Sequence, residues 1–178
     1  MTTQTQFRCF VDSPLGRLQL VASAQGLTSL YYPEHRHALR FEAEEVERHA
    51  VLDSARRELE QYFAGKRIHF DTPLAPPEVR GGTEFQLAVW SALSQIPFGE
   101  TRSYGDIARS IGRPSAVRAV GAANALNPIS IFVPCHRVIG AAGSLTGYAG
   151  GIEAKRWLLD HEASHCESRS YRPPSRGC

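Results

Sequence analysis

A cysteine and a histidine stand side by side in Pro134-Cys135-His136-Arg137, directly after the apolar run 129–133. A thiol attacks as its thiolate, and a nearby imidazole can accept its proton. Adjacent side chains of a strand point to opposite faces, so a bend after Pro134 or a bridging water is needed to connect them. A third group should orient the imidazole, and Glu162 is the candidate. Taken alone, the adjacency is more often core packing than catalysis.

The other three cysteines are Cys9, Cys166 and Cys178, and none stands in a CxxC or CxxH pair. This spacing predicts no zinc or other metal site. The first residues contain no basic and apolar signal segment, so we expect a cytoplasmic protein with free thiols. The absence of 18 consecutive apolar residues argues against a transmembrane helix and a membrane partner. Cys9 alternates within a strand-like run and is expected to be a small buried hydrophobe.

The charge of the chain is unevenly distributed. The 178 residues are 42% hydrophobic, which suits one domain or two small ones sharing a core. The net charge is +2, but residues 1–100 carry −3 and residues 101–178 carry +5. Arginine supplies 18 of the 20 basic residues, and guanidinium suits contacts with phosphate. This distribution suggests an acidic module joined to one that meets an anion.

The first part of the chain has the pattern of a small sheet with a helix. Residues 7–11, 17–23 and 27–32 alternate as strands of an antiparallel meander, with a Pro- and Gly-containing turn between the first two. The polar residues 38–49 are compatible with a helix, and residues 53–63 predict one with a single apolar face. The prolines and glycines of 71–82 indicate a linker.

The second part of the chain is predicted to be mainly helical. Thr83 with Gln86 forms a capping-box pattern that opens a helix, and Ser103 with Asp106 can cap a second one over 104–111. A third helix is expected from Pro114 to about Ala125, after a Gly turn. The last two helices match a helix-turn-helix, which alone is a weak signal for DNA. The many small residues of the third helix suit close helix packing equally well.

The remaining elements complete an α+β chain. Residues 129–133 read as a buried strand, and a Gly-rich loop over 143–151 follows the Cys-His pair. A helix is expected over 152–162, and the polar tail 163–178 is expected to be disordered.

The segment Val133–Ile139 closely resembles the active-site motif of the O6-alkylguanine-DNA alkyltransferases, also called methylated-DNA–protein-cysteine methyltransferases. The resemblance spans about residues 83–162, with a weaker match at 12–16. Its other motifs fall in family order: Phe85-Gln86, Val89-Trp90, Ile96–Thr101, Ser103–Ala108, Arg118–Gly121, Asn127-Pro128, Gly147-Tyr148, Gly150-Gly151 and Lys155–Glu162.

The resemblance implies a fold and an activity. The expected fold is a small N-terminal antiparallel sheet with a helix, ribonuclease-H-like in the family, over residues 1–76. A linker over 77–82 leads to a winged helix-turn-helix-like domain over 83–162 that carries the active-site cysteine. The implied activity is direct DNA repair, in which the alkyl group of O6-alkylguanine in duplex DNA moves irreversibly to Cys135. The protein would act once, bind the minor groove, flip the damaged base and need no cofactor. It is expected to be a monomer without DNA, and O4-alkylthymine is a second candidate substrate.

Residue roles carry over from the resemblance. Cys135 is the expected nucleophile, His136 the base acting through a water, Glu162 the group that orients His136, and Asn127 the holder of the turn. The expected DNA-binding and base-flipping residues are Arg118, Tyr104, Ala119, Gly121 and Ala123. The expected substrate pocket consists of Pro134, Val138, Tyr148 and Ala149, and Ala149 stands where some relatives carry serine.

Two other functions fit parts of the pattern. A cysteine hydrolase built on the Cys135, His136 and Glu162 side chains would turn over with burst kinetics. A winged helix-turn-helix regulator would recognise one DNA sequence and survive Cys135→Ala in every assay.

Overall fold

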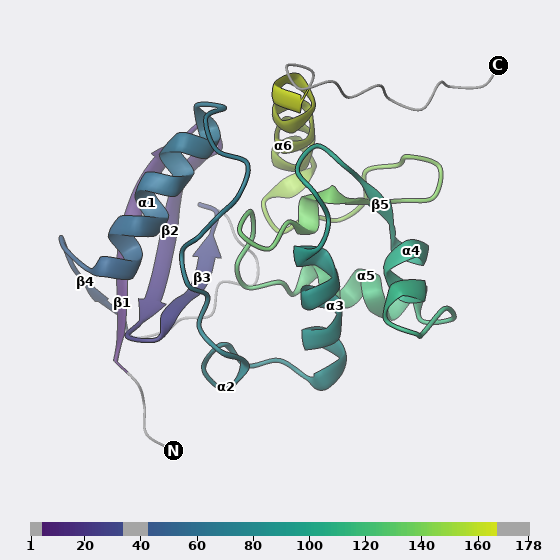
Figure 1. Ribbon diagram of the computed structural model, residues 1–178, viewed down its shortest axis with the longest axis horizontal. Helices are drawn as coiled ribbons and strands as arrows, with labels where there is room; N and C mark the ends of the chain where they lie inside the picture. The colour runs from purple at the N-terminus through teal and green to yellow at the C-terminus, as the bar shows by residue number, and fades with distance from the viewer. Residues whose placement is uncertain (1–4, 34–42, 167–178) are drawn as a thin grey trace.

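The N-terminal half of the molecule is a four-stranded sheet with one helix against it. The computed structural model describes residues 5–33 and 43–166. The strands are β1 (Gln6–Ser13), β2 (Gly16–Ser23), β3 (Gly26–Tyr31) and β4 (Ala43–Glu45), in the order β3-β2-β1-β4. Helix α1 (Ala50–Phe63) covers one face of this sheet (Figure 1).

The alternation of β1 and β2 explains this packing. Cys9 and Val11 of β1 and Leu18 and Leu20 of β2 are buried, and the apolar side of α1 packs in the same core. Successive strand residues face opposite sides, so one face of this antiparallel pair can be apolar. The predicted antiparallel pairing of the first three strands is confirmed, and so is the burial of Cys9.

The region after β3 differs from the prediction. Residues 43–45, expected to be helical, form β4 and pair in parallel with β1. The outer edge of β1 offers unpaired backbone groups that an extended segment can satisfy, which outweighs a weak helix preference. The sheet is therefore not a pure meander. Residues 38–42 lie outside the described residues, and α1 begins at Ala50 rather than at 53.

The C-terminal half is built from short helices. They are α2 (Pro77–Arg80), α3 (Glu84–Ser94), α4 (Tyr104–Ser110), α5 (Val117–Ala125) and α6 (Gly151–Cys166). Thr83 and Ser103 each cap a helix with a complete capping box, as predicted. The predicted linker contains α2, with Pro77 at its first position, where a missing N–H is harmless.

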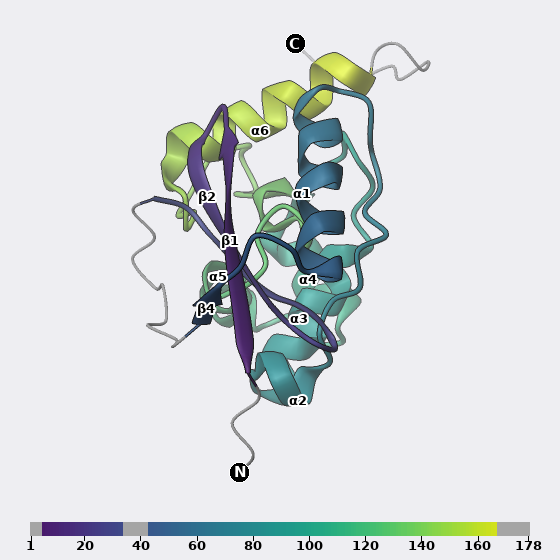
Figure 2. The ribbon, with the colours of Figure 1, turned by 90° about the vertical axis from the view of Figure 1, so that its left-hand side faces the viewer.

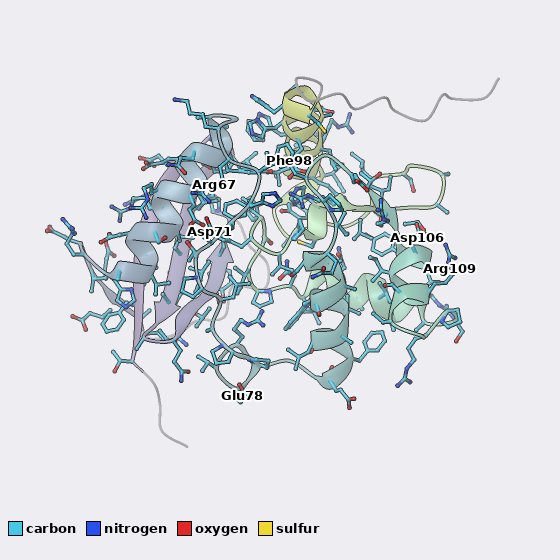
Figure 3. All side chains as sticks on the ribbon, viewed as in Figure 1. Arg67, Asp71, Glu78, Phe98, Asp106 and Arg109 are labelled. Carbon is cyan, nitrogen blue, oxygen red and sulfur yellow. The ribbon has the colours of Figure 1, made fainter. Side chains whose placement is uncertain are left out.

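The helix-turn-helix consists of α4 and α5, but α5 starts later than expected. It begins at Val117, and the segment from Pro114 to Ala116 belongs to the turn. The Ala116 N–H bonds Arg113 O, which closes this turn before the first helical bond, from Val120 N–H to Ala116 O. In Figure 3, Asp106 and Arg109 of α4 lie at the right of the view, on the other side of the molecule from Arg67 and Asp71, which follow α1.

The segment before Cys135 is not the predicted strand. Residues 129–133 form a tight turn in which Ser130 bridges Val133, and only Ile129 pairs with the sheet, through Leu30 of β3. Ile131 has φ 74°, a left-handed backbone that a β-branched residue rarely adopts. A one-turn 3-10 helix, η1 (Cys135–Arg137), follows, and β6 (Val138–Ile139) then pairs in parallel with β5 (Arg102–Ser103).

Helix α6 joins the two halves of the molecule. It passes the C-terminal end of α1 (Figure 2). At this crossing His161 Nε2 lies 2.8 Å from the carbonyl oxygen of Tyr62. The helix continues to Cys166, so its predicted end at residue 162 is wrong, as is the prediction of disorder for residues 163–166. The rest of the predicted tail lies outside the described residues. Within 5–33 and 43–166, no helix is long and apolar enough to cross a membrane.

Candidate active site

Asn127 closes the turn that presents Cys135. Its side-chain Nδ2 donates to Val133 O at 2.8 Å, and its Oδ1 accepts from the Ile129 N–H at 3.2 Å. Asn127 is 2% exposed, so both bonds are shielded from water. The turn is held from the other side by Leu30, whose N–H donates to Pro128 O at 2.9 Å. The Asn127 side chain therefore links the start and the end of the turn that precedes Cys135.

Cys135 is a buried thiol at the start of η1. It is 2% exposed, and its Sγ lies 3.8 Å from Ser130 Oγ. Burial raises the pKa of the Cys135 thiol, although the side chains of Asn127 and Ser130 and the charge of Lys155 act against this rise. The thiol is consequently protonated near neutral pH, and a base must take its proton before it can attack.

His136 and Glu162 form a buried pair. His136 Nε2 lies 2.8 Å from Glu162 Oε1, and the two residues are 0% and 1% exposed. Burial lowers the pKa of His136 in spite of the neighbouring carboxylate, so the imidazole is neutral. An ionised carboxylate only accepts, which places the proton of this imidazole on Nε2 and leaves Nδ1 as the basic nitrogen.

Nδ1 of His136 has no hydrogen-bond partner among the described residues. The described residues also contain no direct hydrogen bond between His136 and Cys135. Both side chains project from the same turn of 3-10 helix rather than from a strand. The chain therefore bends after Pro134, as one of the two predicted possibilities required, instead of continuing as a strand through Cys135 and His136.

Glu162 receives five hydrogen bonds. Its Oε1 accepts from His136, Tyr62 and Arg137, and its Oε2 accepts from Arg137 and the Gly99 N–H. Burial alone would raise the pKa of Glu162, but the hydrogen bonds from His136 and Arg137, together with the charge of Arg137, outweigh it and hold the pKa well below its ordinary value. Glu162 lies one turn before the end of α6, where an acidic residue is usually exposed. Glu162 is buried instead, with 1% of its surface exposed.

Lys155 is a second buried charge next to the active-site segment. It is 0% exposed, and its Nζ donates to Val138 O at 2.6 Å and to Thr146 O at 3.1 Å. These bonds tie the Gly-rich loop to the segment that follows Cys135. The ammonium charge also favours the thiolate form of Cys135.

A cavity of about 680 Å³ lies beside the Gly-rich loop. Its lining includes Tyr148 and Ala149 of this loop and Tyr32 of the N-terminal half. The hydroxyls of Tyr32 and Tyr148 are 2.7 Å apart, and the Tyr148 ring stands edge-on to His136 with centroids 6.5 Å apart. Pro134 and Val138 are buried close by but do not line this cavity.

The helix-turn-helix presents one exposed face of small residues. Arg118 and Ala119 of α5 are exposed, whereas Gly121 is half-buried facing the Tyr104 ring. Tyr104 OH accepts from Thr146 Oγ1 at 3.2 Å, which connects α4 to the Gly-rich loop. Ala123 is 3% exposed in the core, and its carbonyl accepts from the Trp90 indole. The prediction that Ala123 contacts DNA is wrong, because its side chain points away from this face.

Comparison with known proteins gives the family of the chain. Residues 84–164 match the model of the 6-O-methylguanine DNA methyltransferase DNA-binding domain, and residues 7–76 match that of its ribonuclease-like domain. A methylated-DNA–protein-cysteine methyltransferase from Methanosarcina acetivorans is 49% identical over 153 residues, which cover 86% of this chain and 96% of that protein. The chain belongs to the 6-O-methylguanine DNA methyltransferase family.

Two further 6-O-methylguanine DNA methyltransferases agree with this assignment. The methylated-DNA–protein-cysteine methyltransferase of Mycobacterium tuberculosis is 50% identical over 160 residues, covering 86% of this chain and 90% of that protein. The crystal structure of Mycobacterium tuberculosis OGT in complex with DNA matches with a TM-score of 0.80 and 49% identity, covering 88% of this chain and 92% of that one. The predicted family and fold class are confirmed.

Three polar residues next to the methyltransferase site were missed by the sequence predictions. Arg137 and Lys155 stand inside the recognised motifs but carry no predicted role, and Tyr62 belongs to the N-terminal domain. Each is buried and bonded to an atom of the site. The available signals were the position of Arg137 directly after the Cys-His pair and that of Lys155 at the start of the motif 155–162. Within the described parts of the chain, no group of three or more His, Cys, Asp or Glu residues could hold a metal ion.

Proposed function

We propose that Cys135 is the residue that accepts the alkyl group, and that the protein repairs O6-alkylguanine in duplex DNA by one irreversible transfer. The supporting observation is the buried set of Cys135, His136 and Glu162 in a chain of this family. Cys135 Sγ attacks the alkyl carbon, an S–C bond forms, and the bond from that carbon to the guanine oxygen breaks. The thioether is stable to hydrolysis, so the protein acts stoichiometrically.

His136 is the proposed base for this transfer. With Nε2 held by Glu162, Nδ1 accepts the thiol proton through a bridging water, and the departing guanine takes up one proton in exchange. Glu162 stabilises the imidazolium that forms, because its own charge is fixed by Arg137. A protonated thiol beside a neutral imidazole keeps Cys135 unreactive until the substrate is in place.

The proposed DNA surface is the exposed face of α5, bound in the minor groove. The similar OGT of Mycobacterium tuberculosis was crystallised in complex with DNA. A base inside the duplex must be flipped to meet a buried thiol. Arg118 enters the stack in place of the flipped base, while Ala119 and Gly121 allow the backbone to come close. Tyr104 acts on the phosphate next to the lesion. We also expect a monomer without DNA and a domain boundary within 77–82.

The proposed base pocket is the region of Tyr148, Ala149, Val138 and Pro134. Tyr148 and Ala149 line the cavity, and the carbonyls of Cys135 and Val138 each retain a lone pair for the guanine amine. The Ala149 N–H is the proposed donor to the departing oxygen. Cys135 is 2% exposed, so the side chains that cover Sγ must move before a base reaches it.

Arg118→Ala should impair repair of duplex DNA much more than reaction with a free O6-alkylguanine base. The guanidinium is exposed on α5 and its proposed task is flipping, which a free base does not need. Unstacking a base costs a few kcal/mol, so we expect a rate loss on the order of 100-fold for duplex and about none for free base. Single-turnover rates on both substrates measure this. Equal losses on both would exclude the flipping role, and Arg156→Ala on α6 is the matched exposed control.

Intact mass spectrometry tests the proposed function. After the protein is mixed with a duplex that contains one O6-methylguanine, its mass should rise by a single CH2, and the added methyl should map to the peptide with Cys135. The lesion should disappear in equal molar amount. Continued turnover would favour a hydrolase, and an unchanged mass with an intact lesion would refute the proposal.

A further inference from the structure

Helix α1 of the N-terminal domain carries a tyrosine that reaches the active site. Tyr62 is 0% exposed and its hydroxyl donates to Glu162 Oε1 at 2.8 Å, across 100 residues of sequence. Burial and the negative charge of Glu162 raise the pKa of Tyr62 well above its ordinary value. The phenol therefore stays protonated, and toward this carboxylate it acts only as a donor.

Tyr62 and His136 bond the same oxygen. Oε1 of Glu162 accepts from His136 Nε2 and from Tyr62 OH, each at 2.8 Å, and from Arg137 Nη2 at 2.9 Å. Every additional donor takes up part of the charge on a carboxylate oxygen and weakens its attraction for the others. The Tyr62 hydroxyl thus reduces the pull of Glu162 on the proton of His136.

The Tyr62 ring and backbone hold their position without the hydroxyl. The ring packs edge-on against Phe63 and Phe98, with centroids 5.4 and 6.1 Å away. Phe98 is labelled below α6 in Figure 3, at the junction of the two domains. The backbone oxygen of Tyr62 lies 2.8 Å from His161 Nε2, next to Glu162 on α6. A change of Tyr62 to phenylalanine leaves these contacts in place and removes one hydrogen bond.

We propose that Tyr62 is a positioning residue of the active site: its hydroxyl fixes Glu162 Oε1 and limits the hold of that oxygen on His136. The inference rests on the proposed roles of His136 and Glu162. It gives the N-terminal domain a direct part in alkyl transfer, because one donor to the carboxylate behind the base comes from this domain.

Tyr62→Phe tests the proposal through the pH profile of single-turnover methyl transfer from an O6-methylguanine duplex. Without the hydroxyl, Glu162 stabilises the imidazolium more strongly, so the pKa of His136 rises and more of this base is protonated in mild acid. The acidic limb of the profile should move to higher pH by up to about one unit. At the alkaline plateau the rate should fall less than about 10-fold, because Glu162 loses one of five donors.

Tyr31→Phe is the matched control. Tyr31 is also a buried tyrosine of the N-terminal domain, and its hydroxyl donates to Ser29 Oγ at 3.1 Å. Its pH profile should coincide with that of the wild type. A uniform loss of rate in Tyr62→Phe, with an unmoved acidic limb, would reduce Tyr62 to a structural residue and overturn the inference. An unchanged rate and profile would overturn it as well.

Glu162→Gln separates this inference from the proposed function. If that variant transfers methyl with the wild-type rate and profile, the proposed role of Glu162 fails. If it is impaired while Tyr62→Phe is not, only the inference about Tyr62 fails. In the double variant Tyr62→Phe/Glu162→Gln, the profile should equal that of Glu162→Gln alone. A further shift would mean that Tyr62 acts by another route.

Discussion

Cys135→Ser should abolish methyl transfer while binding of duplex DNA remains. A serine hydroxyl is far less acidic than a thiol, and its oxygen is a poorer nucleophile toward an alkyl carbon. The imidazole of His136, the proposed base for the buried thiol, is too weak to generate an alkoxide even with Glu162 behind it. We expect no added methyl after the protein is incubated with an O6-methylguanine duplex, as measured by intact mass together with the lesion that remains.

Cys166→Ser is the control for this substitution. Cys166 is a free cysteine in the last turn of α6 and is partly exposed, so its thiol is more accessible than that of Cys135. If exposure alone decided which of the described thiols at Cys9, Cys135 and Cys166 is alkylated, Cys166 would be the acceptor. Full transfer in Cys166→Ser and none in Cys135→Ser would assign the acceptor. Full transfer in Cys135→Ser and none in Cys166→Ser would instead make Cys166 the acceptor.

The parts of the fold that sequence predicts best depend on local interactions. The Thr83 and Ser103 capping boxes form between residues three apart, and alternation along β1 and β2 decides which side chains face the core. The segment 129–133 was wrongly predicted as a strand because its apolar residues are buried in a turn. That turn depends on the Asn127 side chain and on Leu30 of β3, which no local pattern contains.

The candidate site divides in the same way. Cys135 and His136 are neighbours in sequence and Asn127 precedes them closely, so one resemblance reaches all three. Arg137 and Tyr62 meet Glu162 across 25 and 100 residues, and a buried arginine is not visible in a pattern that places charges on the surface. The error at Ala123 has a related cause, since α5 has small residues on both its exposed and its buried face.

Arg137→Met should destabilise the protein strongly. Arg137 is 6% exposed, and its guanidinium donates to both oxygens of Glu162 and to the carbonyl of Ile96. Methionine fills much of the same volume but leaves the carboxylate of Glu162 buried without its cation. Breaking one side of a buried ion pair costs about 3–5 kcal/mol, which urea unfolding can measure. Arg156→Met on the exposed face of α6 should change the free energy of unfolding by less than about 0.5 kcal/mol.

A second substitution distinguishes loss of the charge pair from loss of packing. If the cost of Arg137→Met comes from the uncompensated carboxylate, then Glu162→Gln should recover part of it by removing that charge. The double variant should therefore be more stable than Arg137→Met alone, although Glu162→Gln by itself destabilises the wild type. A double variant whose loss equals the sum of the two single losses would mean that the residues act independently. In that case Arg137 would stabilise α6 through packing and Ile96, and the ionised state of Glu162 would depend mainly on its other donors.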